Sequence, residues 1–368
     1  MPGSDETKRL FVAATRQNEG KTTVSLGLLS AFHEICPPVG FMKPVGQRYV
    51  EVEDVRVDED VALMRAVFEP EAGLADMSPV TIGSSFTRDY IRNPDPEKIE
   101  RHILESYERV ARGKHSVIIE GTGHAGVGSV FDMCNARVAK LLGAKVVIVT
   151  GGGIGRPIDE VMLNRSLFAQ YGVELLGVIL NKVLPHKLEE IAAVVEDGLA
   201  HQGIELLGVM PYEEILANPT MQQVLDELHG DLLHGRDFLG NEIQTVIVGA
   251  MTAHRALDYI YRRCLLITPG DREDLILAAM SSCAVGMDKS NCVAGMLLTG
   301  GVTPQKNILR LLRRTQIPVV LVDDSSYAAA TAVKDLQIKI QPLDRKKIIT
   351  ARRLVKRHVN VQRIVESL

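Results

Sequence analysis

Tryptophan is absent from this chain, and aromatic residues make up only 4% of its 368 residues. Basic residues are scattered except near the C-terminal end, and the net charge is −4, so no surface for nonspecific binding of nucleic acid is indicated. No apolar stretch approaches the roughly eighteen residues that a membrane-spanning helix needs. The apolar run at 10–14 is also too short for a secretory signal. These absences predict a cytoplasmic protein whose partners are neither membranes nor nucleic acids.

Cysteine is also scarce, and its spacing argues against several kinds of site. The five cysteines are Cys36, Cys134, Cys264, Cys283 and Cys292. No two of them are separated by only two residues, the spacing typical of zinc and iron–sulfur sites, and the pattern does not indicate a disulfide framework. We therefore expect all five to be small buried apolar residues.

The strongest positive pattern lies near the start of the chain, where an apolar run at 10–14 leads into a loop and then an apolar helix. The loop reads Thr15, Arg16, Gln17, Asn18, Glu19, Gly20, Lys21, Thr22 and Thr23. It is typical of a phosphate-binding loop (P-loop), although Thr15 stands where the strict pattern has its first glycine. A chance Gly-Lys-Thr at a helix start is the alternative. The strand before the loop and the helix after it favour nucleotide binding.

Each part of this loop has an expected role. The backbone N–H groups of residues 16–22 can surround a β-phosphate, and the N-terminus of the following helix adds a favourable dipole. Lys21 should reach the β- and γ-phosphate oxygens, and Thr22 should hold Mg²⁺. We therefore predict Arg16, Gln17, Asn18, Glu19, Gly20, Lys21, Thr22 and Thr23 as residues that bind ATP.

After the loop, short apolar runs alternate with helical patterns, which indicates βα units and a parallel sheet. The predicted strands are 10–14, 39–43, 116–120, 145–150, 176–180 and 206–209. The predicted helices are 21–34, 58–67, 96–112, 135–142, 157–171 and 187–201. The run 146–149 is apolar at every position, as expected where helices cover both faces of a sheet. We predict an α/β fold of the P-loop NTPase type, with a doubly wound, mostly parallel sheet.

A second alternating series follows a polar segment. We predict a first domain at 1–227, a linker at 228–241 and a second, smaller α/β domain at 242–368. The predicted strands of the second domain are 245–248, 264–268, 293–299 and 318–322. Its predicted helices are 253–261, 272–281, 305–314 and 327–336, followed by a basic amphipathic helix at 345–359. For that last helix we favour solvated surface over a membrane or nucleic-acid contact.

Polar side chains stand at the ends of three predicted strands or at the start of a following helix. Ligands of such sheets bind at the carboxyl ends of the strands, so Lys43, Asp60 and Glu120 are site candidates. Lys43 could neutralise a transferring phosphoryl group or hold an anionic substrate, although it could also be an ordinary surface lysine. Asp60 and Glu120, with Thr22, are the expected ligands of Mg²⁺. We predict Lys21 and Lys43 as the catalytic residues.

Two further strand ends could hold the base of a nucleotide. Asn181 and Pro211 each follow an apolar run, at positions where amide hydrogen bonds and apolar contacts commonly hold a nucleoside base. Asn181 could equally be an ordinary loop residue.

The first domain resembles the dethiobiotin synthetase group of P-loop proteins. The resemblance covers about residues 8–215 and rests on Gly20-Lys21-Thr22, Lys43-Pro44-Val45, Asp60, Glu120-Gly121-x-Gly123 and Asn181-Lys182. It implies ATP and Mg²⁺ as cofactors. Arg16 and Gln47 depart from that group and speak against diaminopelargonate as substrate. Arg16 also lies five residues before Lys21, as does the extra lysine of ATPases that act across a dimer, which hints at a homodimer.

The remainder resembles a DRTGG domain over about residues 245–358, and the same pair of domains forms the N-terminal region of long phosphate acetyltransferases. The motif departs from its family, because Gly270-Asp271-Arg272-Glu273-Asp274 stands in place of Asp-Arg-Thr-Gly-Gly. DRTGG domains are regarded as regulatory or dimerising modules.

Three functions remain open from the sequence. The first is an ATP- and Mg²⁺-binding regulatory protein without the acyltransferase catalytic domain, so not itself a complete phosphotransacetylase. The second is an ATP-dependent ligase that activates a carboxylate or carbamate, of the dethiobiotin synthetase or cobyrinic acid a,c-diamide synthase type. The third is a scaffold whose nucleotide pocket has decayed. Expected partners are a nucleotide, a small carboxylate or acyl-phosphate metabolite, and a second copy of the chain.

Overall fold

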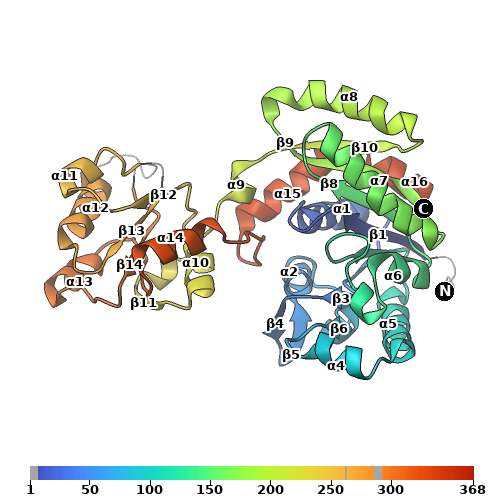
Figure 1. Ribbon diagram of the computed structural model, residues 1–368, viewed down its shortest axis with the longest axis horizontal. Coiled ribbons are helices and arrows are strands. Elements are labelled where there is room, and N and C mark those ends of the chain that lie inside the picture. Colours follow the sequence, from blue (N-terminus) through green and yellow to red (C-terminus); the bar gives the residue numbers. More distant parts are fainter. Residues whose placement is uncertain (1–6, 262, 286–291) are drawn as a thin grey trace. The chain divides into compact units, whose positions relative to one another are not determined.

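The chain forms two compact units in the computed structural model, which describes residues 7–261, 263–285 and 292–368 (Figure 1). The first unit comprises Met1–Glu213 together with Ile340–Leu368, and the second comprises Glu214–Lys339. The second unit is therefore inserted, along the sequence, into the first.

The core of the first unit is a parallel sheet of six strands in the order β10-β9-β8-β1-β7-β2. These strands are β1 (Lys8–Ala14), β2 (Val39–Met42), β7 (Ser116–Glu120), β8 (Lys145–Thr150), β9 (Leu175–Val183) and β10 (Leu206–Pro211). Every residue of β7 is buried, because helices cover both faces of the sheet. The predicted α/β class with a mostly parallel central sheet is confirmed.

Helices connect the strands in a regular way. They are α1 (Lys21–Ile35), α5 (Pro96–Ala111), α6 (Asn135–Leu141), α7 (Gly155–Gln170) and α8 (Leu188–His201), and η2 (Ser129–Phe131) and η3 (Pro185–Lys187) are short 3₁₀ turns. The connection from β1 through α1 leads toward the β2 edge of the sheet. The connections through α5, α6, α7 and α8 lead in the opposite direction, toward the β10 edge. Because such crossovers are right-handed, α1 lies on one face of the sheet and α5–α8 lie on the opposite face.

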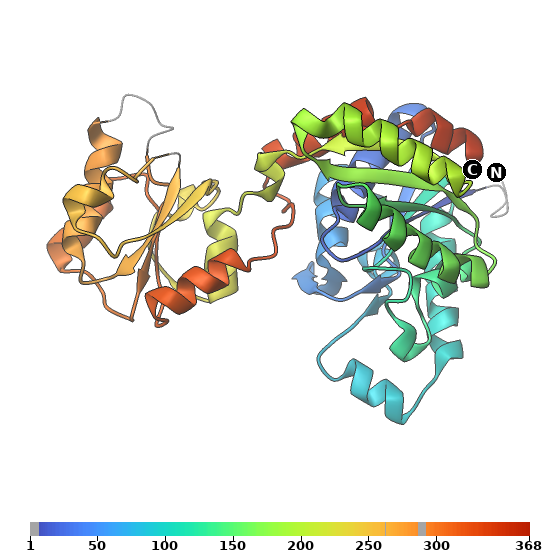
Figure 2. The ribbon, with the colours of Figure 1, turned by 45° about the horizontal axis from the view of Figure 1, so that its top comes forward.

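The C-terminal residues complete the first unit rather than the second. Helices α15 (Arg345–His358) and α16 (Val361–Ser367) pack against α1, side by side with it in both views (Figures 1 and 2). Gly27 of α1 allows this close approach, since a Cβ at Gly27 would overlap Val355 and lie 3.0 Å from the carbonyl oxygen of Ala351. The basic helix therefore belongs to the first unit and not, as predicted from the sequence, to the second domain.

Between β2 and α5 the chain forms a small excursion that carries part of the site. It contains β3 (Val45–Gly46), β4 (Tyr49–Val52), β5 (Val55–Asp58), α2 (Glu59–Phe68), α3 (Leu74–Met77), β6 (Val80–Thr81) and α4 (Phe86–Arg92). Asp58 ends β5 and caps α2, because its side chain accepts a hydrogen bond of 2.9 Å from the backbone N–H of Asp60. This cap fixes the first turn of α2.

The second unit is a five-stranded sheet in the order β11-β15-β14-β13-β12, parallel except for β11. Its strands are β11 (Asp231–His234), β12 (Thr245–Val248), β13 (Cys264–Pro269), β14 (Gly295–Thr299) and β15 (Val319–Leu321). Its helices are α9 (Glu214–Ala217), α10 (Met221–Leu228), α11 (Ala253–Ala256), α12 (Glu273–Val285), α13 (Lys306–Leu312) and α14 (Ser326–Lys334), and η4 (Arg236–Phe238) is a 3₁₀ turn. One apolar cluster lies on each face of the sheet.

Two expectations for this part of the chain need correction. The segment 228–241 is not a linker, because β11 lies within it and pairs with β15 as an edge strand of the sheet. Cys283 and Cys292 form a disulfide, whereas Cys134 and Cys264 are free and buried as expected, and Cys36 is free but only half-buried.

No helix in the described residues is long and apolar enough to cross a membrane.

Candidate functional site

The phosphate-binding loop occupies the centre of the sheet's carboxyl edge. It follows β1, which lies between β7 and β8. Glu120 is the last residue of β7, and Thr150 is the last residue of β8. Side chains from both neighbouring strands therefore reach the loop, as expected at the carboxyl edge of a parallel sheet.

Thr22 brings two predicted metal ligands together. Its hydroxyl donates to Asp60 Oδ1 at 3.0 Å and lies 3.2 Å from Glu120 Oε1. Thr22 lies in the first turn of α1, Asp60 in the first turn of α2 and Glu120 at the end of β7. Three elements that are distant in sequence thus place three oxygen-bearing side chains around one point.

Lys43 is buried among the carboxylates, not exposed on the surface. Its ammonium forms an ion pair with Asp60, lies 3.0 Å from Asp58 Oδ1 and lies 3.8 Å from Glu120 Oε1. Burial by itself would lower the pKa of Lys43, but Asp60, Glu120 and Asp58 outweigh that effect and hold the pKa above its usual value. Lys43 is therefore a protonated cation inside the site.

Glu120 has an unusual protonation equilibrium. Burial, followed by the negative charge of Asp60, raises the pKa of Glu120 to about 7, although Lys43 and Lys21 act in the opposite direction. Glu120 Oε2 is buried and has no hydrogen-bond partner among the described residues. An additional positive charge beside Glu120 would offset the repulsion between Glu120 and Asp60 and would give the Oε2 oxygen a partner.

The donor set fits Mg²⁺. One hydroxyl and two carboxylates are hard oxygen ligands, and Mg²⁺ is usually held by one or two carboxylates together with substrate phosphates. No group of three or more acidic, His or Cys side chains in the described residues is arranged to hold a metal by itself. A divalent cation at this position would therefore depend on ligand oxygens as well as on Thr22, Asp60 and Glu120.

The loop itself is held on several sides. The hydroxyl groups of Thr15 and Thr150 are 3.0 Å apart, so the residue that replaces the usual first glycine joins the loop to β8. Arg16 forms an ion pair with Glu160 of α7. Gln17 donates to the Gln47 side chain at 3.1 Å.

The remaining predicted residues lie in the loop itself or at the ends of β9 and β10. Gly20 has a φ of 92°, a left-handed conformation that favours glycine, and Asn18 also has a positive φ, at 63°. Asn181 contacts the loop directly, because its amide donates to the carbonyl of Glu19 at 2.9 Å. Pro211 pairs with Val183 at the end of β10.

Three contributing residues were missed or underestimated from the sequence. Asp58 was not predicted as a site residue, yet it is an ion-pair partner of Lys43. Lys182, next to Asn181, donates to the carbonyl of Asn18. Thr150 supports Thr15. Thr150 and Lys182 both stand at strand ends, so the rule that predicted Glu120 could have found them too.

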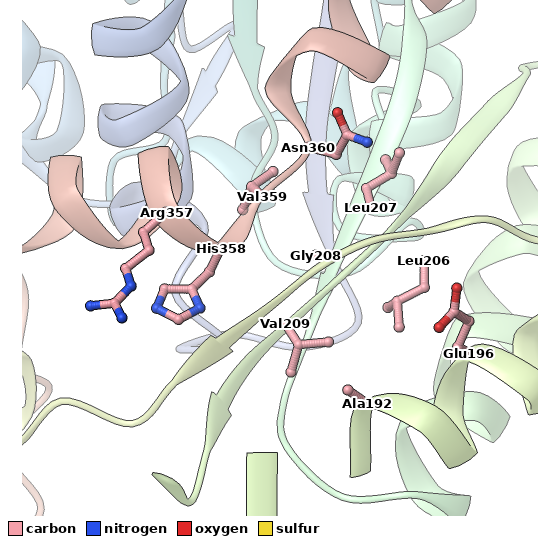
Figure 3. A pocket seen from close by; sticks show the side chains of 10 residues that line it. All are labelled: Ala192, Glu196, Leu206, Leu207, Gly208, Val209, Arg357, His358, Val359 and Asn360. Atoms are coloured by element: carbon pink, nitrogen blue, oxygen red, sulfur yellow. The ribbon is translucent and has the colours of Figure 1, made fainter. Parts of the chain in front are cut away.

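A shallow depression of about 380 Å³ lies elsewhere on the first unit, along β10 (Figure 3). Arg357 and His358 lie together on one side of it, and Glu196 of α8 lies on the other. Burial and the neighbouring Arg357 lower the pKa of His358. None of the residues predicted to bind nucleotide or metal lines this depression.

Two protein-family models match the chain. A family described as AAA domain matches residues 8–220, and a DRTGG domain matches residues 223–336. This pair is that of the N-terminal region of long phosphate acetyltransferases, as the sequence analysis expected.

Curated relatives match the chain across both of these domains. The phosphate acetyltransferase of Nitratidesulfovibrio vulgaris is 29% identical over 96% of this chain and 51% of its own length, and that of Pseudomonas aeruginosa is 27% identical over 96% and 51%. The chain thus spans about half the length of the curated relatives it matches. Among solved structures, a MinC:MinD cell division protein complex from Aquifex aeolicus is similar with a TM-score of 0.38 and 14% identity, over 57% of this chain and 84% of that chain.

These relatives overturn the functional expectations from the sequence. Proteins named phosphate acetyltransferase match 90–98% of the chain and extend well beyond the match. The expectation of a protein that lacks an acyltransferase domain, and is therefore no phosphotransacetylase, was wrong. The same relatives contradict the alternative of an ATP-dependent carboxylate- or carbamate-activating ligase, because they are named phosphate acetyltransferases.

Proposed function

Because this chain belongs to the AAA-domain family that matches residues 8–220 and continues into a DRTGG domain, we propose that it is part of a phosphate acetyltransferase. The carrying observation is that curated proteins of that name match nearly the whole chain, across both domains. The proposed reaction exchanges an acetyl group between phosphate and coenzyme A. The carbonyl carbon of acetyl phosphate loses its bond to the phosphate oxygen and gains a bond to the thiol sulfur.

We propose that the first unit binds a nucleoside triphosphate, ATP in the first instance, at residues 16–23. Support comes from the loop between β1 and α1, where Lys21 begins the helix and Gly20 has a left-handed backbone. The helix N-terminus favours negative charge at the same point. Lys43 would supply a further positive charge near the terminal phosphate.

We also propose Mg²⁺ as the accompanying ion, held by Thr22, Asp60 and Glu120. The support is the convergence of these oxygens together with Glu120 Oε2, which is buried and has no hydrogen-bond partner in the described part of the chain. When bound, Mg²⁺ would neutralise phosphate charge, and the chain's own residues would orient it.

Two experiments on the purified protein test the two parts of the proposal separately. Acetyl transfer is measured as formation of the acetyl-CoA thioester from acetyl phosphate and coenzyme A. Nucleotide binding is measured by calorimetry with ATP, with and without Mg²⁺. No thioester formation would refute the acetyltransferase, and no heat of ATP binding would refute the nucleotide site.

A matched pair of variants tests the loop. Lys21→Ala should weaken ATP binding by about 2–3 kcal/mol, a factor of roughly 30–150, because a charge-assisted phosphate contact is lost. Lys187→Ala removes an exposed lysine in the 3₁₀ turn Pro185–Lys187 and should leave the affinity unchanged. Equal affinities of the two variants would contradict the proposed role of Lys21.

A regulatory role for the nucleotide and assembly into a homodimer complete the proposal. If the nucleotide regulates acetyl transfer, ATP should change the rate of thioester formation in the wild type but not in Lys21→Ala. Arg16 pairs with Glu160 of its own chain, so its contact in the structure does not support a reach across a dimer. Light scattering on the purified protein tests the homodimer directly.

A further inference from the structure

The depression along β10 has opposite charges on its two sides (Figure 3). Arg357, at the end of α15, lies on one side, and Glu196 of α8 lies on the other. Within the described residues, neither side chain forms an ion pair or a hydrogen bond. Nearby, Arg363 of α16 donates to both carboxylate oxygens of Glu205, which directly precedes β10, at 2.9 and 3.0 Å. Charges that can reach each other at this edge are therefore paired, whereas the depression separates Glu196 from Arg357.

The α15 side of the depression is fixed to the sheet by the backbone that joins α15 to α16. The backbone N–H of Asn360 donates to the Leu207 carbonyl oxygen at 2.8 Å, and Val359 forms an antiparallel bridge with Gly208. Glycine is needed at this position of β10, because a Cβ there would overlap the carbonyl oxygen of His358. These contacts hold the end of α15 in one position along β10.

The α8 side leaves room for an apolar group. Ala192 and Glu196 are four residues apart on α8, so they lie on the same side of this helix. Ala192 is small, and the side chains of Leu206 and Val209 also line the depression. The volume of about 380 Å³ falls within the range of small-molecule sites, near its lower end. The depression therefore combines an apolar surface with two opposite charges, at a size that suits a small metabolite.

The two charges restrict the class of ligand. A nucleotide or another multiply charged anion would be repelled by Glu196, and a polyamine would be repelled by Arg357. His358 does not change this balance, because burial and the neighbouring Arg357 lower its pKa and keep the ring neutral at pH 7. A molecule with one ammonium group and one carboxylate group can pair with Glu196 and Arg357 at the same time. The rest of such a molecule would meet the apolar surface.

We propose that the depression along β10 binds a free amino acid with an apolar side chain. Glu196 pairs with the ammonium group and Arg357 with the carboxylate, while the side chain of the ligand lies against Ala192 and Val209. None of the residues predicted to bind nucleotide or metal lines the depression, so this inference does not depend on the proposed nucleotide site. Both charged side chains are exposed, and exposed ion pairs contribute little. We therefore expect a dissociation constant on the order of 1 mM.

Leucine and two analogues of it test the class of ligand. Methyl NMR on the purified protein suits weak binding, because the signals of Ala192 and Val209 report on the depression itself. L-leucine should shift these two signals, and the signal of Ala14, directly before the phosphate-binding loop, should stay unchanged. Isocaproate lacks the ammonium group of leucine and isoamylamine lacks the carboxylate, so each should bind about threefold more weakly than leucine or worse.

Two pairs of variants locate the site. Ala192→Leu fills the depression without changing its charge and should abolish the shift at Val209, whereas Ala193→Leu, at the exposed neighbouring position, should retain it. Glu196→Gln removes the partner of the ammonium group, so leucine should bind no better than isocaproate does. Asp197→Asn removes an exposed carboxylate that does not line the depression, and it should bind leucine as the wild type does.

Each outcome decides for or against the proposal. No shift at Val209 with leucine tenfold above the expected dissociation constant would overturn it. Equal affinity for leucine and both analogues would also overturn it, as would a preference for leucine over isocaproate that persists in Glu196→Gln. A shift that persists in Ala192→Leu would place the leucine elsewhere. ATP calorimetry on the same samples reports separately on the nucleotide site, so either proposal can fail without the other.

Discussion

Replacing Lys43 with methionine tests the electrostatic description of the site. The Lys43 side chain is 6% exposed, and its carboxylate partners Asp58, Asp60 and Glu120 are each less than 5% exposed. Methionine keeps an apolar stem of similar length and removes the ammonium. The variant then has three buried carboxylates that have lost this cation.

The expected cost follows from general measurements on buried ion pairs. Removing one partner of such a pair costs about 3–5 kcal/mol, because an uncompensated charge stays buried. For a unit of this size, 1 kcal/mol corresponds to about 2–4 °C in Tm, so the first unit should melt roughly 6–20 °C lower at pH 7. Near pH 5 the loss should be smaller, since the carboxylates of the variant can take up protons.

Calorimetry suits this measurement, because the chain contains no tryptophan for intrinsic fluorescence. Adding Mg²⁺ without nucleotide should raise the Tm of Lys43→Met more than that of the wild type, since the cation replaces the lost ammonium. Lys356→Met is the matched control. Its partner Glu34 and Lys356 itself are more than half exposed, so that variant should lose less than about 1 kcal/mol.

Two results would refute this reasoning. If the Tm of Lys43→Met falls no further than that of Lys356→Met, the carboxylates do not depend on the Lys43 ammonium. A loss that does not diminish between pH 7 and pH 5 would mean that unpaired carboxylates are not its cause.

The remaining predictions concern pH, helix packing and the loop. The pKa of Glu120 is raised from 4.5 to about 7, so the native state binds more protons in that window and the free energy of unfolding falls as pH rises through it. In Glu120→Gln the free energy of unfolding, measured by urea titration, should depend less on pH in this range. An unchanged dependence on pH would assign it to other groups. Gly27→Ala should cost about 1–3 kcal/mol through overlap with Val355, despite the better helix propensity of alanine. A Cβ at Gly155 would meet no atom within 4 Å, so Gly155→Ala should cost no stability. An equal loss of stability in the two variants would contradict the packing argument. Lys21→Ala, described above, should lose ATP affinity.

Sequence patterns were sufficient for three of the strands. The runs that became β7, β8 and β12 are short, rich in β-branched residues and bounded by polar or turn residues, so their limits were predicted to the residue. β11 was missed, because Asp231 and His234 enclose only two apolar residues and resemble a polar connection. A short edge strand of that kind gains its structure from pairing with β15, which local sequence does not reveal.

Candidate residues at the site were predicted from strand ends, and their mutual contacts were not. The rule that ligands bind at the carboxyl edge identified Lys43 and Glu120. It could not show that Lys43 is buried against Asp58, since that contact depends on how the excursion between β2 and α5 folds back. The packing of α15 on Gly27 joins segments more than 300 residues apart and has no local signature.

The division of the first unit into two sequence segments has a consequence for synthesis. Residues 214–339 leave the ribosome before Ile340–Leu368, so the inserted unit can fold while its host still lacks the helices that cover α1. Until residues 340–368 emerge, the apolar side of α1 beside Gly27 is open to water and to chaperones. The first unit should therefore reach its final structure only when residues 340–368 have been synthesised and packed on α1.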